Sequence, residues 1–80
     1  MRLDKYLKVS RLIKRRTVAN EACDAGKITV NDKVARAAYD VKGGDVIEIT
    51  LGSKSVKVKV TEVKEVVRKE DAATMYEAAV

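Results

Sequence analysis

The sequence predicts a small α+β protein, with two N-terminal helices packed on a small antiparallel sheet and a further helix at the C-terminal end. Three observations predict this order. Apolar residues recur at helical spacing as far as Ala25, the period changes to two after Gly26, and residues 70–80 again have helical composition. A chain of 80 residues can build only one modest core, and here Val, Ile, Leu and Ala must form it because Phe and Trp are absent.

The first helix is predicted over residues 3–13. On a helix, its apolar and small residues share one face: Leu3, Tyr6, Leu7, Ser10 and Ile13. The basic residues form a stripe on the opposite face: Lys5, Lys8 and Arg11. Asp4 suits the first turn, because the helix macrodipole favours a negative charge there. We expect Tyr6 and Tyr76 to be core residues.

The second helix is predicted to follow the basic cluster of residues 14–16, with Thr17 as its N-cap and Gly26 just past its end. Its apolar face is expected to consist of one row and two flanking residues: Val18, Ala22 and Ala25, with Ala19 and Cys23. These small side chains predict close packing against the first helix, with Cys23 buried.

Strands are predicted where apolar residues alternate with polar ones: residues 28–30, 33–36, 46–51 and 56–60. Asn31 and Asp32 should form the tight turn between the first two strands, because both residue types tolerate positive φ. The alternation in the last strand predicts a buried valine face and an exposed lysine face.

The positive charge is concentrated at the N-terminal end of the chain. Residues 1–16 contain seven basic residues and one acid, a net charge of +6, whereas the whole chain has +5. The rest of the chain therefore has a slight negative excess. Charge gathered in this way attracts a polyanion better than charge spread evenly, so we look for the functional surface here.

The composition argues against an enzyme, a metal site or a bound cofactor. There is no histidine to act as a general base, and Cys23 is the only cysteine. The carboxylates are scattered and no glycine-rich phosphate loop is present. No apolar run approaches the roughly 20 residues that span a bilayer, and no signal peptide opens the chain, so we expect a soluble cytoplasmic protein without a membrane partner.

Several motifs occur in the order that is typical of S4-type RNA-binding domains, and residues 2–51 resemble that family. They are the Arg-Leu-Asp opening at residues 2–4, the basic and small pair Arg16 and Ala19, the Gly-x-hydrophobic-x-Val-Asn hairpin at residues 26–31, and Gly44-Asp45 before a core strand. Asp32 stands where the family usually has glycine. The resemblance implies the S4-like (alpha-L) RNA-binding fold.

Residues 70–78, EDAATMYEA, resemble the end of the short stand-alone S4 proteins, the RqcP and small heat-shock S4 protein family, with more similarity to the RqcP-like members. The resemblance implies a division into an S4 domain at residues 1–63 and a C-terminal helical extension at residues 64–80. It also implies a role in protein biosynthesis, in ribosome-associated quality control.

RqcP-like proteins bind large ribosomal subunits that still carry peptidyl-tRNA, touching ribosomal RNA and the tRNA, and assist an RqcH-like partner that extends the stalled chain with alanines. The resemblance therefore implies these partners for this chain, which we expect to be a monomer off the ribosome. Two other functions stay open: a heat-shock-type recycling factor for stalled large subunits, and a basic adaptor module for an acidic protein partner.

The candidate RNA-binding residues combine the basic N-terminal segment with the border of the S4 hairpin: Arg2, Lys5, Lys8, Arg11, Lys14, Arg15, Arg16, Lys27, Asn31 and Lys33. The alternative for the basic side chains is an ordinary solvated surface. Asp4 could cap the helix or orient a neighbouring arginine, or it could bond a base or a ribose hydroxyl directly.

Overall fold

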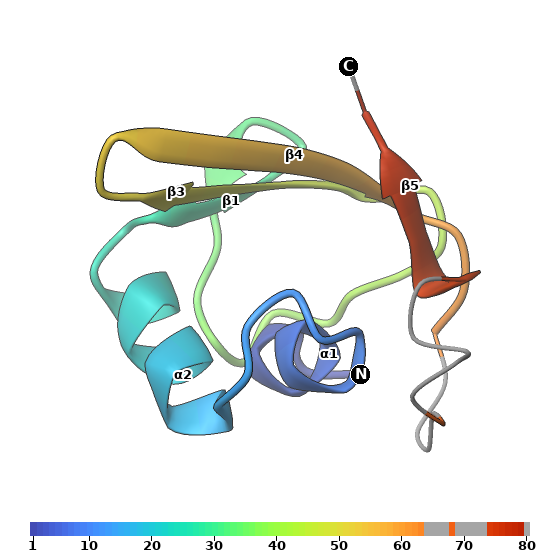
Figure 1. The fold of residues 1–80 in the computed structure, drawn as a ribbon, viewed down its shortest axis with the longest axis horizontal. Coiled ribbons are helices and arrows are strands. Elements are labelled where there is room, and N and C mark those ends of the chain that lie inside the picture. Colours follow the sequence, from blue (N-terminus) through green and yellow to red (C-terminus); the bar gives the residue numbers. More distant parts are fainter. Residues whose placement is uncertain (64–67, 69–73, 80) are drawn as a thin grey trace.

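The structure, a computed structural model, describes residues 1–63, 68 and 74–79. Its elements are α1 (Leu3–Val9), α2 (Arg16–Asp24), β1 (Ile28–Val30), β2 (Lys33–Val34), β3 (Val46–Leu51), β4 (Lys54–Val60) and β5 (Tyr76–Ala78). The strands form an antiparallel sheet of order β2-β1-β3-β4-β5. Both helices lie against the same side of this sheet (Figure 1). The predicted α+β class is confirmed.

Helix α1 ends at Val9, four residues earlier than predicted. Arg11 has a φ of 63°, which no helix allows, and the chain then folds back so that the N–H of Ile13 donates to the carbonyl of Leu7 at 3.0 Å. This return places Ile13 over the core without a helix. All five residues predicted for the apolar face are therefore buried, and the Ser10 hydroxyl donates to the Leu7 carbonyl.

Helix α2 begins at Arg16, so the prediction of Thr17 as its N-cap is wrong. Arg15 occupies the cap position with extended backbone and makes no capping bond through its side chain. At the other end the prediction is confirmed. Gly26 has a φ of 75°, its N–H donates to Cys23, and the next N–H donates to Ala22, which together form a Schellman motif.

The buried face of α2 is rotated from the predicted row. Ala19, Ala22 and Cys23 are buried, whereas the side chain of Val18 is 44% exposed and Ala25 is exposed. The spacing of three and four residues still gives one continuous stripe. Its small side chains let α2 pack closely on α1, which brings the N-terminal ends of the two helices together.

The central sheet forms as the period-two pattern predicts. Asn31 and Asp32 have φ values of 53° and 68° and make the predicted tight turn. Strand β2 is shorter than expected, with only two residues. In the long hairpin β3 pairs with β4, and four of its inward residues are buried: Ile47, Ile49, Val58 and Val60. The predicted buried valine face is wrong at Val56, which is 49% exposed.

The predicted C-terminal helix is wrong for the part of it that the structure describes. Tyr76–Ala78 is strand β5, paired with the outer edge of β4 (Figure 1). The rest of the prediction, residues 70–73 and 80, lies outside the described residues. The division at residue 63 stays a prediction.

A buried contact fixes the C-terminal segment to the first helix. The hydroxyl of Tyr6, which is fully buried, donates to the Met75 carbonyl at 2.7 Å. Burial raises the pKa of Tyr6, and the nearby Tyr76 raises it further, so this phenol remains a donor. Tyr6 is a core residue as predicted, and Tyr76 is half-buried against the core.

Candidate RNA-binding surface

A buried carboxylate lies at the centre of the surface where the two helices begin. Asp4 stands in the first turn of α1 and is only 2% exposed. A charge removed from water in this way is costly unless it is paired and hydrogen-bonded. The backbone N–H of Lys5 donates to Asp4 Oδ1 at 2.8 Å, which satisfies part of this need.

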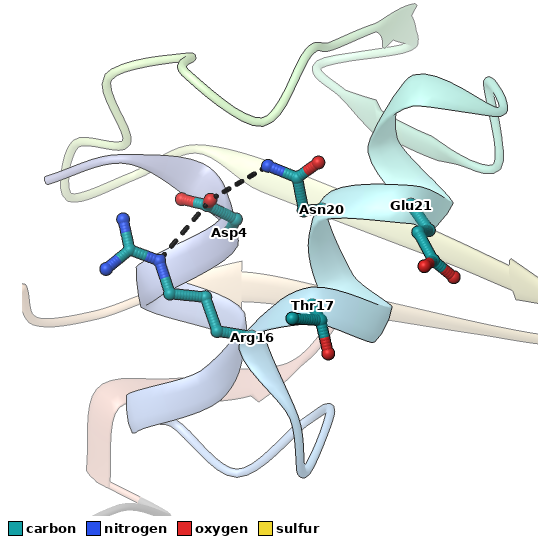
Figure 2. A pocket seen from close by; sticks show the side chains of 5 residues that line it. All are labelled: Asp4, Arg16, Thr17, Asn20 and Glu21. Carbon is teal, nitrogen blue, oxygen red and sulfur yellow. Dashed lines mark hydrogen bonds and ion pairs between the residues drawn. The ribbon is translucent and has the colours of Figure 1, made fainter.

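Three side chains provide the other donors, and they come from two separate places in the chain. Arg2 bonds Asp4 through Nε at 3.2 Å and through Nη2 at 3.4 Å. Arg16 reaches Asp4 Oδ2 through Nε at 3.4 Å, and the amide of Asn20 donates to the same oxygen at 3.3 Å. Figure 2 shows Arg16 and Asn20 converging on Asp4 from the first turns of α2. Asp4 therefore joins the start of α1 to the start of α2.

The balance of these contacts keeps Asp4 charged. Burial acts to raise its pKa, but the hydrogen bonds from Arg2, Asn20, Arg16 and the N–H of Lys5 together lower the pKa below its ordinary value. The carboxylate is therefore ionised at neutral pH. It can hold both guanidinium groups in place through charge-assisted hydrogen bonds, which are stronger than neutral ones.

The two arginines are half-exposed while their partner is buried. The exposed fractions of the side chains are 52% for Arg2 and 48% for Arg16, against 3% for Asp4. Arg16 reaches Asp4 through its Nε, and Figure 2 shows both of its terminal nitrogens beyond this bond. Such guanidinium edges match the geometry of a phosphate group.

A shallow pocket opens beside this pair. It is lined by Asp4, Arg16, Thr17, Asn20 and Glu21 (Figure 2). The first backbone N–H groups of α2 lie at the same end of the helix, where they add to the attraction for an anion. The arrangement can bind a phosphodiester and orient it, and it contains no nucleophile with a paired base.

The structure places the remaining basic candidates on the surface around this centre. Lys8, Lys14 and Arg15 are exposed, and Lys5 is half-exposed. The predicted helical stripe is wrong at Arg11, because this residue lies past the end of α1 in left-handed backbone conformation. Arg11 is nevertheless exposed, and its RNA contact stays a prediction.

The hairpin residues form a second group. Lys27 and Lys33 are exposed at the ends of β1 and β2. Asn31 has a structural role: its amide donates to Asp45 Oδ1 at 3.1 Å and accepts from the N–H of Val46 at 3.0 Å. These bonds fix the turn before β3. A contact between any of these three residues and RNA stays a prediction.

Sequence reasoning missed Asn20, Thr17 and Glu21 as parts of the site. The signal for Asn20 was its position four residues after Arg16, which puts both side chains on one side of α2. Of the roles predicted for Asp4, contact with a neighbouring arginine is the one that the structure contains, because Asp4 pairs with both Arg2 and Arg16. A group of His, Cys, Asp or Glu side chains able to hold a metal ion is not found among the described residues.

The fold and this surface define an S4 domain. The S4 domain family matches residues 1–47, which include both helices, the first hairpin and the start of β3. The chain therefore belongs to the S4 domain family, as its motifs suggested.

Curated relatives extend the match to nearly the whole chain. The protein named RQC P-site tRNA stabilizing factor from Halalkalibacterium halodurans is 62% identical over 77 residues, which are 96% of this chain and 88% of the relative. The protein of the same name from Bacillus subtilis is 55% identical over 95% of this chain and 88% of its own length. This chain belongs to the same family as these factors.

Solved structures agree with the fold. A trimeric structure of heat shock protein 15 from Vibrio cholerae has a TM-score of 0.91 at 25% identity and covers 99% of this chain and 81% of that one. The solution structure of the hypothetical protein HP1423 has a TM-score of 0.84 at 27% identity and covers 100% and 98%. In the part of the chain that is described, no helix is long and apolar enough to cross a membrane.

Proposed function

We propose that this chain binds the large ribosomal subunit with its P-site tRNA during ribosome-associated quality control and so assists C-terminal alanine tailing of the stalled nascent chain. The observation that carries the proposal is the pair of arginines held by Asp4 at the meeting point of the two helices. The name shared by the H. halodurans and B. subtilis relatives supports the choice of a P-site tRNA as the ligand.

The binding step is electrostatic and geometric. The net charge of +6 in residues 1–16 draws the domain to the RNA phosphates, and Arg2 and Arg16 then fix its orientation through directed bonds. Contacts to the tRNA and to ribosomal RNA through one rigid surface would join these two molecules. The tRNA would then dissociate from the P site more slowly, which gives the tailing reaction time to proceed.

We further propose that the chain acts without catalysis, as a cytoplasmic monomer that joins the ribosome. An RqcH-like partner would bring alanyl-tRNA and the elongation chemistry would belong to the ribosome. Two observations support a binding role: the sequence lacks histidine, and among the described residues no base is hydrogen-bonded to the Thr17 hydroxyl that lines the pocket beside Arg16. An open, shallow pocket also suits a phosphate backbone better than an enclosed small substrate.

A recycling factor for stalled large subunits is the second candidate, and the likeness to V. cholerae heat shock protein 15 favours it. Both candidates use the same RNA surface. They differ in the reaction that follows, since only the first requires alanine tails.

Sedimentation through a sucrose gradient tests the binding. We expect the protein to migrate with large subunits that carry peptidyl-tRNA and to leave vacant large subunits more readily. Arg16→Ala should weaken the binding on the order of fivefold or more, as expected for a phosphate contact. Lys57→Ala removes the same charge from the exposed face of β4 and should change the binding little.

The salt dependence adds a second measure of the same surface. If about 4–6 phosphates are neutralised, the logarithm of the binding constant should fall against the logarithm of the salt concentration with a slope of about −3 to −5. Three results would each contradict the proposed function. They are a slope near zero, an equal loss of binding for Arg16→Ala and Lys57→Ala, and wild-type protein that stays at the top of the gradient.

A further inference from the structure

Asp4 brings a negative charge into the most basic surface of the protein. Simple charge counting says that this carboxylate should repel RNA and that its removal should strengthen binding. The contacts of Asp4 point the other way, because the described residues that bond its carboxylate all do so as donors.

We propose that Asp4 is a positioning residue that makes Arg2 and Arg16 a single preformed phosphate site. The proposal rests on the proposed function and deepens it. Arg2 is the N-cap residue of α1 and Arg16 is the first residue of α2, so the packed helices set their backbone positions but leave the two long side chains free to choose where their guanidinium groups lie. The two carboxylate oxygens fix these positions: Arg2 Nε is at 3.2 Å from Oδ1, and Arg16 Nε is at 3.4 Å from Oδ2.

The burial of Asp4 gives this arrangement its rigidity. Its side chain is 3% exposed, and it accepts hydrogen bonds from the backbone N–H of Lys5 and from the amide of Asn20, which hold it in one orientation. The arginine side chains are about half-exposed and would otherwise sample many rotamers. Ordering a long side chain on binding costs free energy, and a site that is ordered beforehand avoids that cost.

The use of Nε in both arginines leaves terminal nitrogens for the ligand. Arg16 keeps both of its Nη groups, and Arg2 keeps Nη1, because its Nη2 already bonds Asp4 at 3.4 Å. Figure 2 shows the terminal nitrogens of Arg16 beyond its bond to Asp4. A phosphate accepts several such donors at once, so the pair can hold one phosphodiester group, or two that follow each other along an RNA strand.

Asparagine cannot replace this carboxylate, although it has nearly the same shape. Donors face both carboxylate oxygens of Asp4. The side-chain amide of asparagine has only one oxygen, so in either orientation its NH₂ group would point at donors that now bond Oδ1 or Oδ2. Asp4→Asn therefore raises the net charge by one and at the same time releases at least one arginine. Binding to large subunits that carry peptidyl-tRNA should become weaker, on the order of tenfold, as follows from the ordering cost of two long side chains.

Glu77→Gln is the matched control. Glu77 is exposed on β5, outside the pocket, and makes no ion pair with Arg2 or Arg16. This substitution also raises the net charge by one, and it should leave the affinity equal or raise it by up to about twofold, as weak exposed charges do. Opposite effects of the two substitutions are the signature of positioning.

A double-mutant cycle separates positioning from a general structural effect. In the background of Arg2→Ala/Arg16→Ala, Asp4→Asn should cause no further loss of affinity, because the groups through which it acts are gone. A further tenfold loss in that background, or an affinity of Asp4→Asn equal to or above that of the wild type, would overturn the proposal. Neither of these two results would contradict the proposed function, as long as the wild type binds large subunits and Arg16→Ala does not.

Nuclear magnetic resonance of the arginine Nε–H groups of the wild-type protein provides a test that does not depend on a variant that folds. The Nε–H groups of Arg2 and Arg16 should give resolved signals with slow exchange and restricted motion, in contrast to the exposed Arg15. Motion of Arg2 and Arg16 as fast as that of Arg15 would show that the pair is not preformed and would overturn the proposal.

Discussion

Substitution of Tyr6 by phenylalanine tests whether the C-terminal segment is held to the first helix as the structure shows. The change removes only the hydroxyl, which donates to the Met75 carbonyl at 2.7 Å, and keeps a ring that is fully buried. A buried hydrogen bond contributes a net of about 0.5–1.5 kcal/mol to stability. The penalty for an unsatisfied acceptor should not be added here, because the Met75 carbonyl also accepts from the N–H groups of Thr61 at 2.8 Å and Glu62 at 3.2 Å.

The expected loss is therefore about 1 kcal/mol in the free energy of unfolding, or a fall of roughly 4–8 °C in Tm for a domain of this size. Urea unfolding followed by circular dichroism measures it, with an unchanged slope showing that both states keep their exposed surface. Tyr39→Phe is the matched control. Its hydroxyl donates to Asp45 at 3.2 Å on the exposed side of the protein, so its loss should stay within about 0.5 kcal/mol.

Two results would refute this reasoning. A loss for Tyr6→Phe no larger than that for Tyr39→Phe would mean that the contact between α1 and residue 75 does not contribute to stability. A loss of more than about 3 kcal/mol would mean that the two backbone donors do not satisfy the Met75 carbonyl when the hydroxyl is gone.

Three further predictions concern the core and the ionised groups. Burial raises the pKa of the Cys23 thiol to about 11, and the nearby charges of Asp4 and Asp24 add to this effect. The folded protein should therefore resist alkylation by iodoacetamide at pH 8 and react once it is unfolded in urea. Rapid modification of the folded protein would refute this prediction. Burial acts to raise the pKa of Asp4, but its hydrogen bonds lower it overall, and the N-terminal ammonium group lowers the pKa of Asp40. The stability that both carboxylates contribute is therefore complete above pH ~4 and should be lost as the pH falls through their lowered pKa values in the folded protein. A urea midpoint that stays constant down to pH 2 would show that these ion pairs do not contribute to stability. Ile49→Asp puts an unpaired charge at a core position and should unfold the domain, whereas a native circular dichroism spectrum for this variant would show that β3 is not packed as described.

Local sequence signals were sufficient for the parts of the fold that depend on neighbouring residues. Gly26 marks the end of α2, and the Asn31-Asp32 pair marks the first hairpin turn, since each of these residues tolerates positive φ. The alternation of apolar residues in β3 and β4 likewise predicts which face of each strand meets the core, although Val56, toward the turn of this hairpin, is 49% exposed. These features need no information from distant parts of the chain.

Features that depend on distant contacts could not be predicted in this way. The composition near residue 76 favours a helix, but the free edge of β4 offers backbone partners for a strand, and this pairing decides the structure. No glycine or proline marks the turn at Arg11 in the sequence. The turn is fixed instead by the N–H of Ile13, which donates to the Leu7 carbonyl.

The site shows the same limit. Charge counting locates the basic surface at residues 1–16, and the Arg-Leu-Asp motif singles out Arg2 and Asp4. That Asp4 joins Arg2 to Arg16 and Asn20 depends on how α1 and α2 are oriented against each other, and local sequence patterns predict the close packing of the helices but not this orientation. The same contacts bear on stability. Because both arginines neutralise a buried carboxylate, losing both should cost more than losing two ordinary exposed charges.

The proposed function requires this surface to support alanine tailing on large subunits that hold a P-site tRNA. Mass spectrometry of the C-terminus of a non-stop reporter tests it most directly, in a strain that lacks the protein and is complemented with wild type, Arg16→Ala or Lys57→Ala at equal expression. We predict alanine tails with the wild type and Lys57→Ala, and none in the deletion strain or with Arg16→Ala. Full-length alanine tails in the deletion strain would contradict the account.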